Sequence, residues 1–281
     1  MIIKNNVKLS EYTTFKMGGE CETLYCPETE KELIDLLESI DEYPLLLGGG
    51  SNIIINDQRR FDKVICLRNF NNDVTDIGDG RYEVGGSVRL QHLINRINKD
   101  GYGGIEYLYS VPGLVGGAIV MNAGRGKKFN RTISDYVVSV KIWENGIIKY
   151  YNKDECDFRY RSSKFKQQSG CVVLSVEFAF EEGDSEYYAK EVINRIELVK
   201  RNQDLSYPNC GSIFAEYDFK ILDSFKWNDN NNGKVVFSKK TTNWLLNKNG
   251  TFADAMTKIE KVCDIHDIEK KKYELEVIIW R

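Results

Sequence analysis

The sequence predicts a mixed α/β protein in which roughly the first 200 residues form a large α/β unit and the remainder a small α+β cap. Apolar residues recur at helical spacing in some segments and as short or alternating runs in others, which indicates helices interspersed with strands. Glycine-rich segments join several of these elements. A chain of 281 residues, of which 42% are hydrophobic, can bury a sizeable core.

The elements follow in order along the chain. Thr29 to Glu32 have the pattern of a capping box, apolar residues at helical spacing come next, and Pro44 is expected to end this helix. Ser87 is the expected N-cap of the second helix. Further helices are predicted over 88–99, 186–203 and 253–263. Strands are predicted over 45–47, 53–55, 64–67, 82–84, 136–143, 147–151, 172–180 and 274–280.

Composition excludes several classes of protein. The net charge of −3 disfavours a nucleic-acid binder held by electrostatics. The chain contains no apolar run of about 18 residues, so no membrane span is expected, and its first residues lack a signal-peptide pattern. Seven cysteines without a CxxC pair favour a reducing cytosol over a disulfide framework or a zinc site. With only two histidines, His92 and His266, a mechanism without metal is expected.

Three glycine-rich segments are candidates for binding a phosphorylated ligand. They cover 48–52, 85–87 and 112–124, and the last lies in a stretch, 104–126, that has six glycines and no regular period. Glycine lets backbone N–H groups approach a phosphate closely. Each segment alone is also compatible with a tight turn. Together they predict a diphosphate-bearing ligand, although neither the GxGxxG nor the GxxxxGK[ST] motif is present.

Three further positions carry chemistry that such a ligand could use. Arg161 can bind a carboxylate or phosphate, although a surface arginine cluster is the plainer interpretation. Ser212 follows a glycine in a turn and could donate a proton, but a serine in this position is more often an ordinary turn residue. Glu274 and Glu276 lie two residues apart in a predicted strand, so both should point to one face, as a pocket acid or as exposed edge carboxylates.

These motifs together resemble the UDP-N-acetylenolpyruvoylglucosamine reductase (MurB) family. The resemblance spans nearly the whole chain, and the block around Pro112 is its most specific part. The matching blocks are 12–19 (YTTFKMGG), 47–52 (LGGGSN), 111–118 (VPGLVGGA), 121–124 (MNAG), 160–163 (YRSS), 207–214 (YPNCGSIF) and 274–277 (ELEV).

The resemblance implies an α+β fold: a PCMH-type FAD-binding fold of two α/β subdomains, 1–68 and 69–200, followed by a C-terminal α+β substrate-binding domain, 201–281. It implies that UDP-N-acetylglucosamine enolpyruvate is reduced to UDP-N-acetylmuramate for peptidoglycan synthesis. NADPH would be the co-substrate, and FAD would be bound non-covalently. A cytoplasmic monomer that binds a nucleotide sugar, with no nucleic acid, membrane or metal, is the corresponding expectation.

The resemblance also assigns roles to individual residues. Ser212 would deliver a proton to C2 of the enolpyruvyl group, while Arg161 and Glu276 would stabilise the charge that develops on the carboxylate side. Tyr160, Arg161 and Asn243 would contact the substrate. The residues expected to bind FAD are Gly48, Gly49, Gly50, Ser51, Asn52, Pro112, Gly113, Gly116, Gly117, Asn122 and Gly124.

Two positions depart from the family pattern in the substrate half. Ala215 stands where the family usually has a lysine, and Thr241 stands where it usually has a histidine. Two alternatives therefore stay open beside the reductase. One is a related flavoprotein reductase that acts on another nucleotide sugar, and the other is a flavin-binding homologue without turnover.

Overall fold

A computed structural model of the chain describes two compact units, which are treated separately below. The described residues are 1–40, 45–167, 170–228 and 233–281. Unit 1 contains residues 1–4, 24–49 and 63–198. Unit 2 contains residues 5–23, 50–62 and 199–281. The division into three domains stays a prediction.

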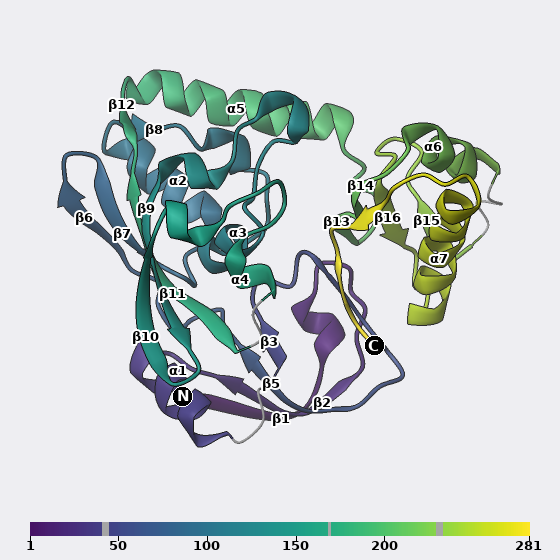
Figure 1. Cartoon of the computed structure of the whole chain (residues 1–281), viewed down its shortest axis with the longest axis horizontal. Coiled ribbons are helices and arrows are strands. Elements are labelled where there is room, and N and C mark those ends of the chain that lie inside the picture. Colours follow the sequence, from purple (N-terminus) through teal and green to yellow (C-terminus); the bar gives the residue numbers. More distant parts are fainter. Residues whose placement is uncertain (41–44, 168–169, 229–232) are drawn as a thin grey trace. The chain divides into compact units, whose positions relative to one another are not determined.

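Unit 1 is built on a five-stranded antiparallel sheet with the strand order β10-β9-β11-β7-β6 (Figure 1). Its strands are β6 Val74–Gly78, β7 Arg81–Gly85, β9 Val137–Glu144, β10 Ile147–Asn152 and β11 Cys171–Ala179. The predicted strands 82–84, 136–143, 147–151 and 172–180 are confirmed to within one or two residues, as β7, β9, β10 and β11. Strand β6 was not predicted. β-Branched and aromatic residues on alternating sides suit a sheet that is covered on both faces.

Helices cover the two faces of this sheet. Helix α1, Glu30–Ser39, packs three leucines against Trp143, Val172 and Leu174. The alternate residues of the same strands face α2, Leu90–Lys99, and α3, Val115–Val120, in a larger apolar cluster. Helix α3 lies in the stretch 104–126, whose sequence has no regular period and did not indicate it.

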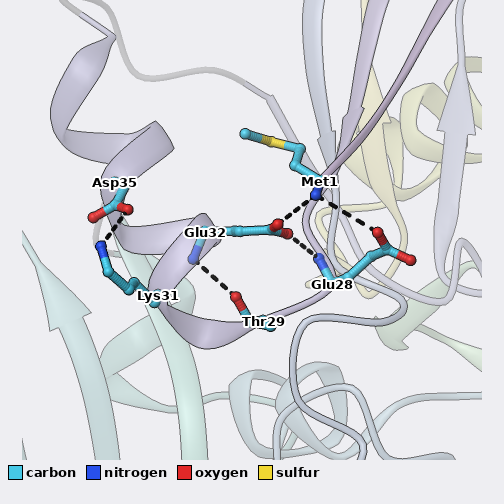
Figure 2. Close-up of polar contacts among 6 residues, drawn as sticks. All are labelled: Met1, Glu28, Thr29, Lys31, Glu32 and Asp35. Atoms are coloured by element: carbon cyan, nitrogen blue, oxygen red, sulfur yellow. Dashed lines mark hydrogen bonds and ion pairs between the residues drawn. The ribbon is translucent and has the colours of Figure 1, made fainter.

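The ends of α1 and α2 test the predicted caps. Thr29 Oγ1 accepts the N–H of Glu32 at 3.1 Å, as predicted, but the Glu32 carboxylate accepts the N–H of Glu28 at 2.8 Å and contacts the amino group of Met1 (Figure 2). Ser87 as the N-cap of α2 was wrong, because the N-cap is Arg89 and Ser87 Oγ donates to the carbonyl of Leu67. Pro44 lies outside the described residues.

Glu106 is a buried carboxyl group in the apolar interior of unit 1. It is 6% exposed, and both of its carboxylate oxygens accept the N–H of Gly104, at 3.0 and 3.1 Å. Burial disfavours the charged form and raises the pKa of Glu106 above its ordinary value. The folded state therefore holds this proton more tightly than the unfolded chain does.

We expect the stability of unit 1 to fall as pH rises from about 4.5, the ordinary pKa of the group, toward the raised pKa of Glu106. Glu106→Gln keeps an oxygen for Gly104 but cannot ionise, so the variant should lose this dependence. Urea unfolding followed from pH 4.5 to 8 would measure both slopes. The exposed Glu182→Gln should keep the wild-type slope, and an unchanged slope in Glu106→Gln would contradict the assignment.

Unit 2 contains several small sheets and two helices around one apolar core. One sheet has the order β13-β16-β15, and two further pairs are β14-β17 and the parallel pair β18-β4. The strands are β4 Ile53–Ile55, β13 Asn209–Ser212, β14 Phe214–Glu216, β15 Val235–Phe237, β16 Trp244–Asn247, β17 Glu274–Leu275 and β18 Ile278–Trp280. The helices are α6 Phe219–Asn228 and α7 Phe252–Ile268.

One predicted strand of unit 2 was wrong. The segment 274–280 is not one strand, because it leaves the pairing with β14 at Leu275 and joins β4 at Ile278. Glu274 is exposed and Glu276, between the two strands, is half-buried, so the two side chains do not share one strand face. The polar run 228–233, whose composition is typical of a loop, lies mostly outside the described residues.

The other elements are short or carry residues of both units. A four-stranded sheet has the order β1-β2-β5-β3. The remaining strands are β1 Ile2–Lys8, β2 Glu20–Cys26, β3 Leu45–Leu47, β5 Phe61–Cys66, β8 Tyr102–Gly103 and β12 Glu181–Glu182. The remaining helices are α4 Lys164–Gln167, α5 Ser185–Asn202 and short 3₁₀ helices at Leu9–Tyr12, Glu106–Leu108, Lys127–Phe129, Ile133–Tyr136 and Asp154–Cys156.

Two features are absent from the described residues, 1–40, 45–167, 170–228 and 233–281. None of the helices found there combines the length and the apolar character needed to cross a membrane. The same residues contain no group of three or more His, Cys, Asp or Glu side chains that could hold a metal ion.

Candidate functional site

The first glycine loop begins in unit 1, directly after β3. The Arg68 guanidinium donates to the carbonyls of Gly48 and Gly49, at 3.4 and 3.2 Å. In a trans peptide the N–H points opposite to the C=O, so these bonds turn the N–H groups of Gly49 and Gly50 away from Arg68. Over the described chain no acceptor is found for either N–H group. The loop thus presents consecutive donors suited to an anion, held by an arginine that the sequence analysis missed.

The surroundings of each glycine separate ligand-facing positions from packing positions. A Cβ atom added at Gly48 or at Gly117 would meet no atom of the described residues within 4 Å, and neither residue has a left-handed φ. Neither position therefore needs glycine for the fold itself. Open space next to unused N–H donors fits a bulky diphosphate, so the residues of unit 1 are compatible with the cofactor that the sequence predicted.

Other glycines in the predicted set are explained by close packing within unit 1. A Cβ atom at Gly116 would lie 3.1 Å from the carbonyl of Gly86, and one at Gly124 would lie 2.5 Å from the carbonyl of Arg131. Gly49 faces the segment of Pro112 and Gly113, because a Cβ atom added at Gly49 would lie 3.4 Å from the Pro112 carbonyl oxygen. The first glycine loop, at Gly49, and the glycine segment 112–124 therefore lie side by side.

Asn122 stabilises the glycine segment 112–124 through its side chain. The residue is buried and left-handed, with φ 42°. Its Nδ2 donates to the carbonyl of Arg159 at 2.9 Å, and its Oδ1 accepts the N–H of Ser134 at 3.4 Å. These bonds give Asn122 a structural role. Its predicted contact with FAD stays a prediction.

Tyr160 and Arg161 form the centre of a tight turn in unit 1. The main chains of Arg159 and Ser162 exchange hydrogen bonds of 2.9 and 3.2 Å across it. Arg161 has φ 54°, a left-handed conformation that costs a non-glycine residue about 1 kcal/mol or more and is often retained at functional sites. Lys127 Nζ lies 5.0 Å from the centre of the half-exposed Tyr160 ring. The turn therefore presents a cationic surface suited to a carboxylate or phosphate.

Unit 2 displays Ser212 on a β-bulge. Asn209 pairs with Leu246 and Ser212 pairs with Trp244, so β13 has one more residue than β16 over the same span. Gly211 takes the left-handed conformation, φ 76°, that this kind of bulge requires. Ser212 is half-buried, and no hydrogen-bond partner of its hydroxyl is found in the part of the chain that the structure describes. The hydroxyl is therefore available to a ligand.

Glu276 lies next to the serine segment through its main chain. Its N–H donates to the carbonyl of Ile213 at 2.8 Å, and the N–H of Val277 donates to the same oxygen at 3.3 Å. Unit 2 thus brings Glu276 close to the residue that follows Ser212. Arg161 belongs to unit 1, so the joint action of all three predicted catalytic residues stays a proposal.

Asn243 holds the serine segment from the other side. Its Oδ1 accepts the N–H of Phe214 at 3.0 Å, its Nδ2 donates to the carbonyl of Phe214 at 2.7 Å, and its own carbonyl accepts the N–H of Ile213 at 3.0 Å. The predicted substrate contact of Asn243 stays a prediction. Its observed partners give it a structural role that the sequence did not indicate.

Gly50, Ser51 and Asn52 belong to unit 2. Gly50 is fixed by packing, because its φ is 69° and a Cβ atom there would lie 2.0 Å from the carbonyl of Tyr12. Thr14 joins this segment to the serine block: its N–H donates to Gly50 at 2.9 Å, and its Oγ1 donates to the carbonyl of Asn209 at 2.7 Å. Sequence reasoning quoted the block around Thr14 but gave it no role.

Three side chains near the serine block bear on the chemistry. Burial raises the pKa of the Cys210 thiol to about 12, so this neighbour of Ser212 stays protonated and unreactive at neutral pH. Thr241, at the position of the family's histidine, accepts the N–H of Asp204 at 2.8 Å. Ala215, at the position of the family's lysine, lies in β14 and brings no charge.

Comparison with known proteins identifies the class and then the family. The family described as "FAD binding domain" matches residues 22–146, which include the glycine segments of unit 1, so the chain has an FAD-binding fold. A UDP-N-acetylenolpyruvoylglucosamine reductase from Carboxydothermus hydrogenoformans is 30% identical, with 99% of this chain and 92% of the relative covered. One from Fusobacterium nucleatum subsp. nucleatum is 29% identical over the full length of both chains.

A solved structure agrees with these relatives. The crystal structure of UDP-N-acetylenolpyruvylglucosamine reductase (MurB) from Thermus caldophilus matches with a TM-score of 0.81 and 25% identity, covering 100% of both chains. The chain belongs to the UDP-N-acetylenolpyruvoylglucosamine reductase family. The family and the α+β, PCMH-type fold predicted from the sequence are confirmed.

Proposed function

We propose that this chain is an FAD-dependent reductase that uses NADPH to convert UDP-N-acetylglucosamine enolpyruvate into UDP-N-acetylmuramate for peptidoglycan synthesis. The full-length family relationship supports the activity. The observation that carries it on the structure is the Ser212 hydroxyl, which has no partner in the described chain and lies on a bulge beside the main chain of Glu276. A flavin-binding homologue without turnover would have no need of this arrangement.

In this proposal the first glycine loop, 48–52, and the glycine segment 112–124 hold FAD. The N–H groups of Gly49 and Gly50 would donate to the diphosphate, and the open faces of Gly48 and Gly117 would leave it room. When bound, FAD accepts a hydride from NADPH and supplies it to C3 of the enolpyruvyl group. Attachment is proposed to be non-covalent: His92, the only histidine in unit 1, has an exposed side chain on α2.

During the reduction, the side chains would stabilise the negative charge that develops on the substrate and donate the proton that it needs. A hydride adding to C3 places negative charge on C2 and the adjoining carboxylate, where the Arg161 guanidinium and the Glu276 carboxyl group would stabilise it. Ser212 would give its proton to C2, completing the new C–H bond, and would regain a proton from solvent. A serine hydroxyl is a weak acid, so it acts only on a strongly basic carbon centre or through a relay.

The remaining assignments follow from the same proposal. The substrate is a nucleotide sugar, and Tyr160, beside the cationic turn, is proposed to contact it together with Asn243. The protein is proposed to be a cytoplasmic monomer without a nucleic-acid or membrane partner. The division of the chain into two FAD-binding subdomains and one substrate-binding domain belongs to the proposal as well.

Steady-state oxidation of NADPH tests the proposed function. The purified holoprotein should oxidise NADPH rapidly only when UDP-N-acetylglucosamine enolpyruvate is present, and the product should be UDP-N-acetylmuramate by mass spectrometry. UDP-N-acetylglucosamine, which lacks the enolpyruvyl group, is the matched control and should not stimulate oxidation. No stimulation by the enolpyruvyl substrate would reject the proposal. If only another unsaturated nucleotide sugar stimulated oxidation, that sugar would be the substrate instead. Ala215 and Thr241, which differ from the family pattern, make this alternative worth testing.

A further inference from the structure

Asn52 is the last residue of the first glycine loop, and its partner lies in the C-terminal segment of unit 2. Its Nδ2 donates to the carbonyl of Glu276 at 3.0 Å. Its own carbonyl accepts the N–H of Ile278, also at 3.0 Å. Two bonds from one residue therefore hold the segment around Glu276, at the point where the chain passes from β17 to β18.

The main chain of Glu276 is held on both sides. Its carbonyl is bonded to Asn52, while its N–H is bonded to the carbonyl of Ile213, the residue after Ser212. Glu276 lies outside regular strand pairing, so these bonds replace a sheet ladder in fixing its backbone. Small displacements of an acid at a reacting centre cost rate steeply, about 10²-fold for 1 Å. The position of this carboxyl group therefore depends on Asn52.

We propose that Asn52 is a positioning residue for Glu276, which connects the end of the glycine loop to the acid on the substrate side. The inference rests on the role given to Glu276 in the proposed function. It differs from the expectation that the Asn52 side chain serves the FAD diphosphate, because the observed acceptor of its amide is a protein carbonyl. If Asn52 bound the diphosphate, removing its amide would reduce FAD occupancy. If Asn52 positions Glu276, removing its amide would slow reoxidation of the flavin by the substrate.

Two variants remove the amide donor. Asn52→Leu deletes it without adding charge, and Asn52→Asp keeps the shape but turns an oxygen toward the Glu276 carbonyl. Asn247→Asp is the matched control, because Asn247 Nδ2 donates to the carbonyl of Phe15 at 2.8 Å in the same unit and does not contact Glu276. In the Asn52 variants we expect wild-type FAD occupancy and wild-type flavin reduction by NADPH. Reoxidation by the enolpyruvyl substrate should slow by about tenfold or more.

A second measurement does not depend on activity. Amide hydrogen exchange of 274–280 should be about tenfold faster in Asn52→Leu than in the wild type, and unchanged in Asn247→Asp. Unchanged exchange in Asn52→Leu would overturn the inference whether or not the enzyme turns over. Loss of FAD with unchanged exchange would show a diphosphate ligand instead. Failure of the wild type to use the substrate, with the exchange result as expected, would reject the proposed function and leave the positional coupling standing.

Discussion

Replacing Ser212 by alanine is expected to slow the second half of the reaction by about 10²-fold or more, the usual size of a lost general acid. The variant loses one hydroxyl, which has no partner within the described residues, so folding and FAD binding should be unaffected. Flavin reduction by NADPH needs no proton from Ser212 and should keep its wild-type rate. Rapid-mixing absorbance of the flavin reports reduction and reoxidation separately.

The control for this variant is Ser224→Ala, which removes an exposed hydroxyl from α6 in the same unit. Both halves should proceed at wild-type rates in the control. If Ser212→Ala slowed both halves equally, the serine would instead help to position the cofactor. A normal second half would remove Ser212 from the mechanism, because the buried and protonated Cys210 thiol offers no substitute at neutral pH.

Replacing Gly48 by valine is expected to abolish stable FAD binding while the apoprotein stays folded. No atom of the described residues lies within 4 Å of a Cβ atom at Gly48. The added side chain would therefore clash with the ligand and not with the protein. Gly49 faces Pro112 and Leu114, so a valine there would also press the two glycine segments apart. Flavin absorbance after gel filtration measures occupancy, and circular dichroism measures folding.

Two further variants separate steric exclusion from backbone effects. Gly48→Ala restricts the backbone nearly as much as valine does but adds only one methyl group, so it should lose less FAD. Gly50→Val should fail to fold, because φ is 69° and its Cβ would lie 2.0 Å from the Tyr12 carbonyl. Equal loss in Gly48→Ala and Gly48→Val would indicate a backbone effect. Full occupancy in Gly48→Val would show that the loop is only a turn.

Local patterns predicted the regular elements well where periodicity and capping agreed. Thr29 caps α1 as expected, and the strands of the five-stranded sheet follow their alternating residues. Prediction failed where long-range pairing decided the structure. The segment 274–280 alternates like a single strand, but its first residues pair with β14 and its last residues pair with β4. Helix α3 has two glycines in six residues, so propensity could not indicate it.

In the candidate site, too, the sequence predicted some features and missed others. Motif reading found Ser212 and the glycine segments, but could not separate glycines that face open space from those, such as Gly124, that touch a neighbouring carbonyl. It also could not assign Thr14, Arg68 or the observed partner of Asn52. Each of these acts through a main-chain carbonyl, which leaves no pattern in a sequence because every residue has one.

The parallel pairing of β4 with β18 has a consequence for how the protein folds. Ile53 lies beside Ile278, and the segments between them include most of unit 1, residues 63–198. Contacts that distant in sequence form late, because the entropy of closing a long loop must be lost before the contact stabilises anything. Unit 1 draws most of its residues from one stretch, 63–198, and should therefore organise first. A refolding chain would then acquire its glycine segments early and complete the serine and glutamate region last.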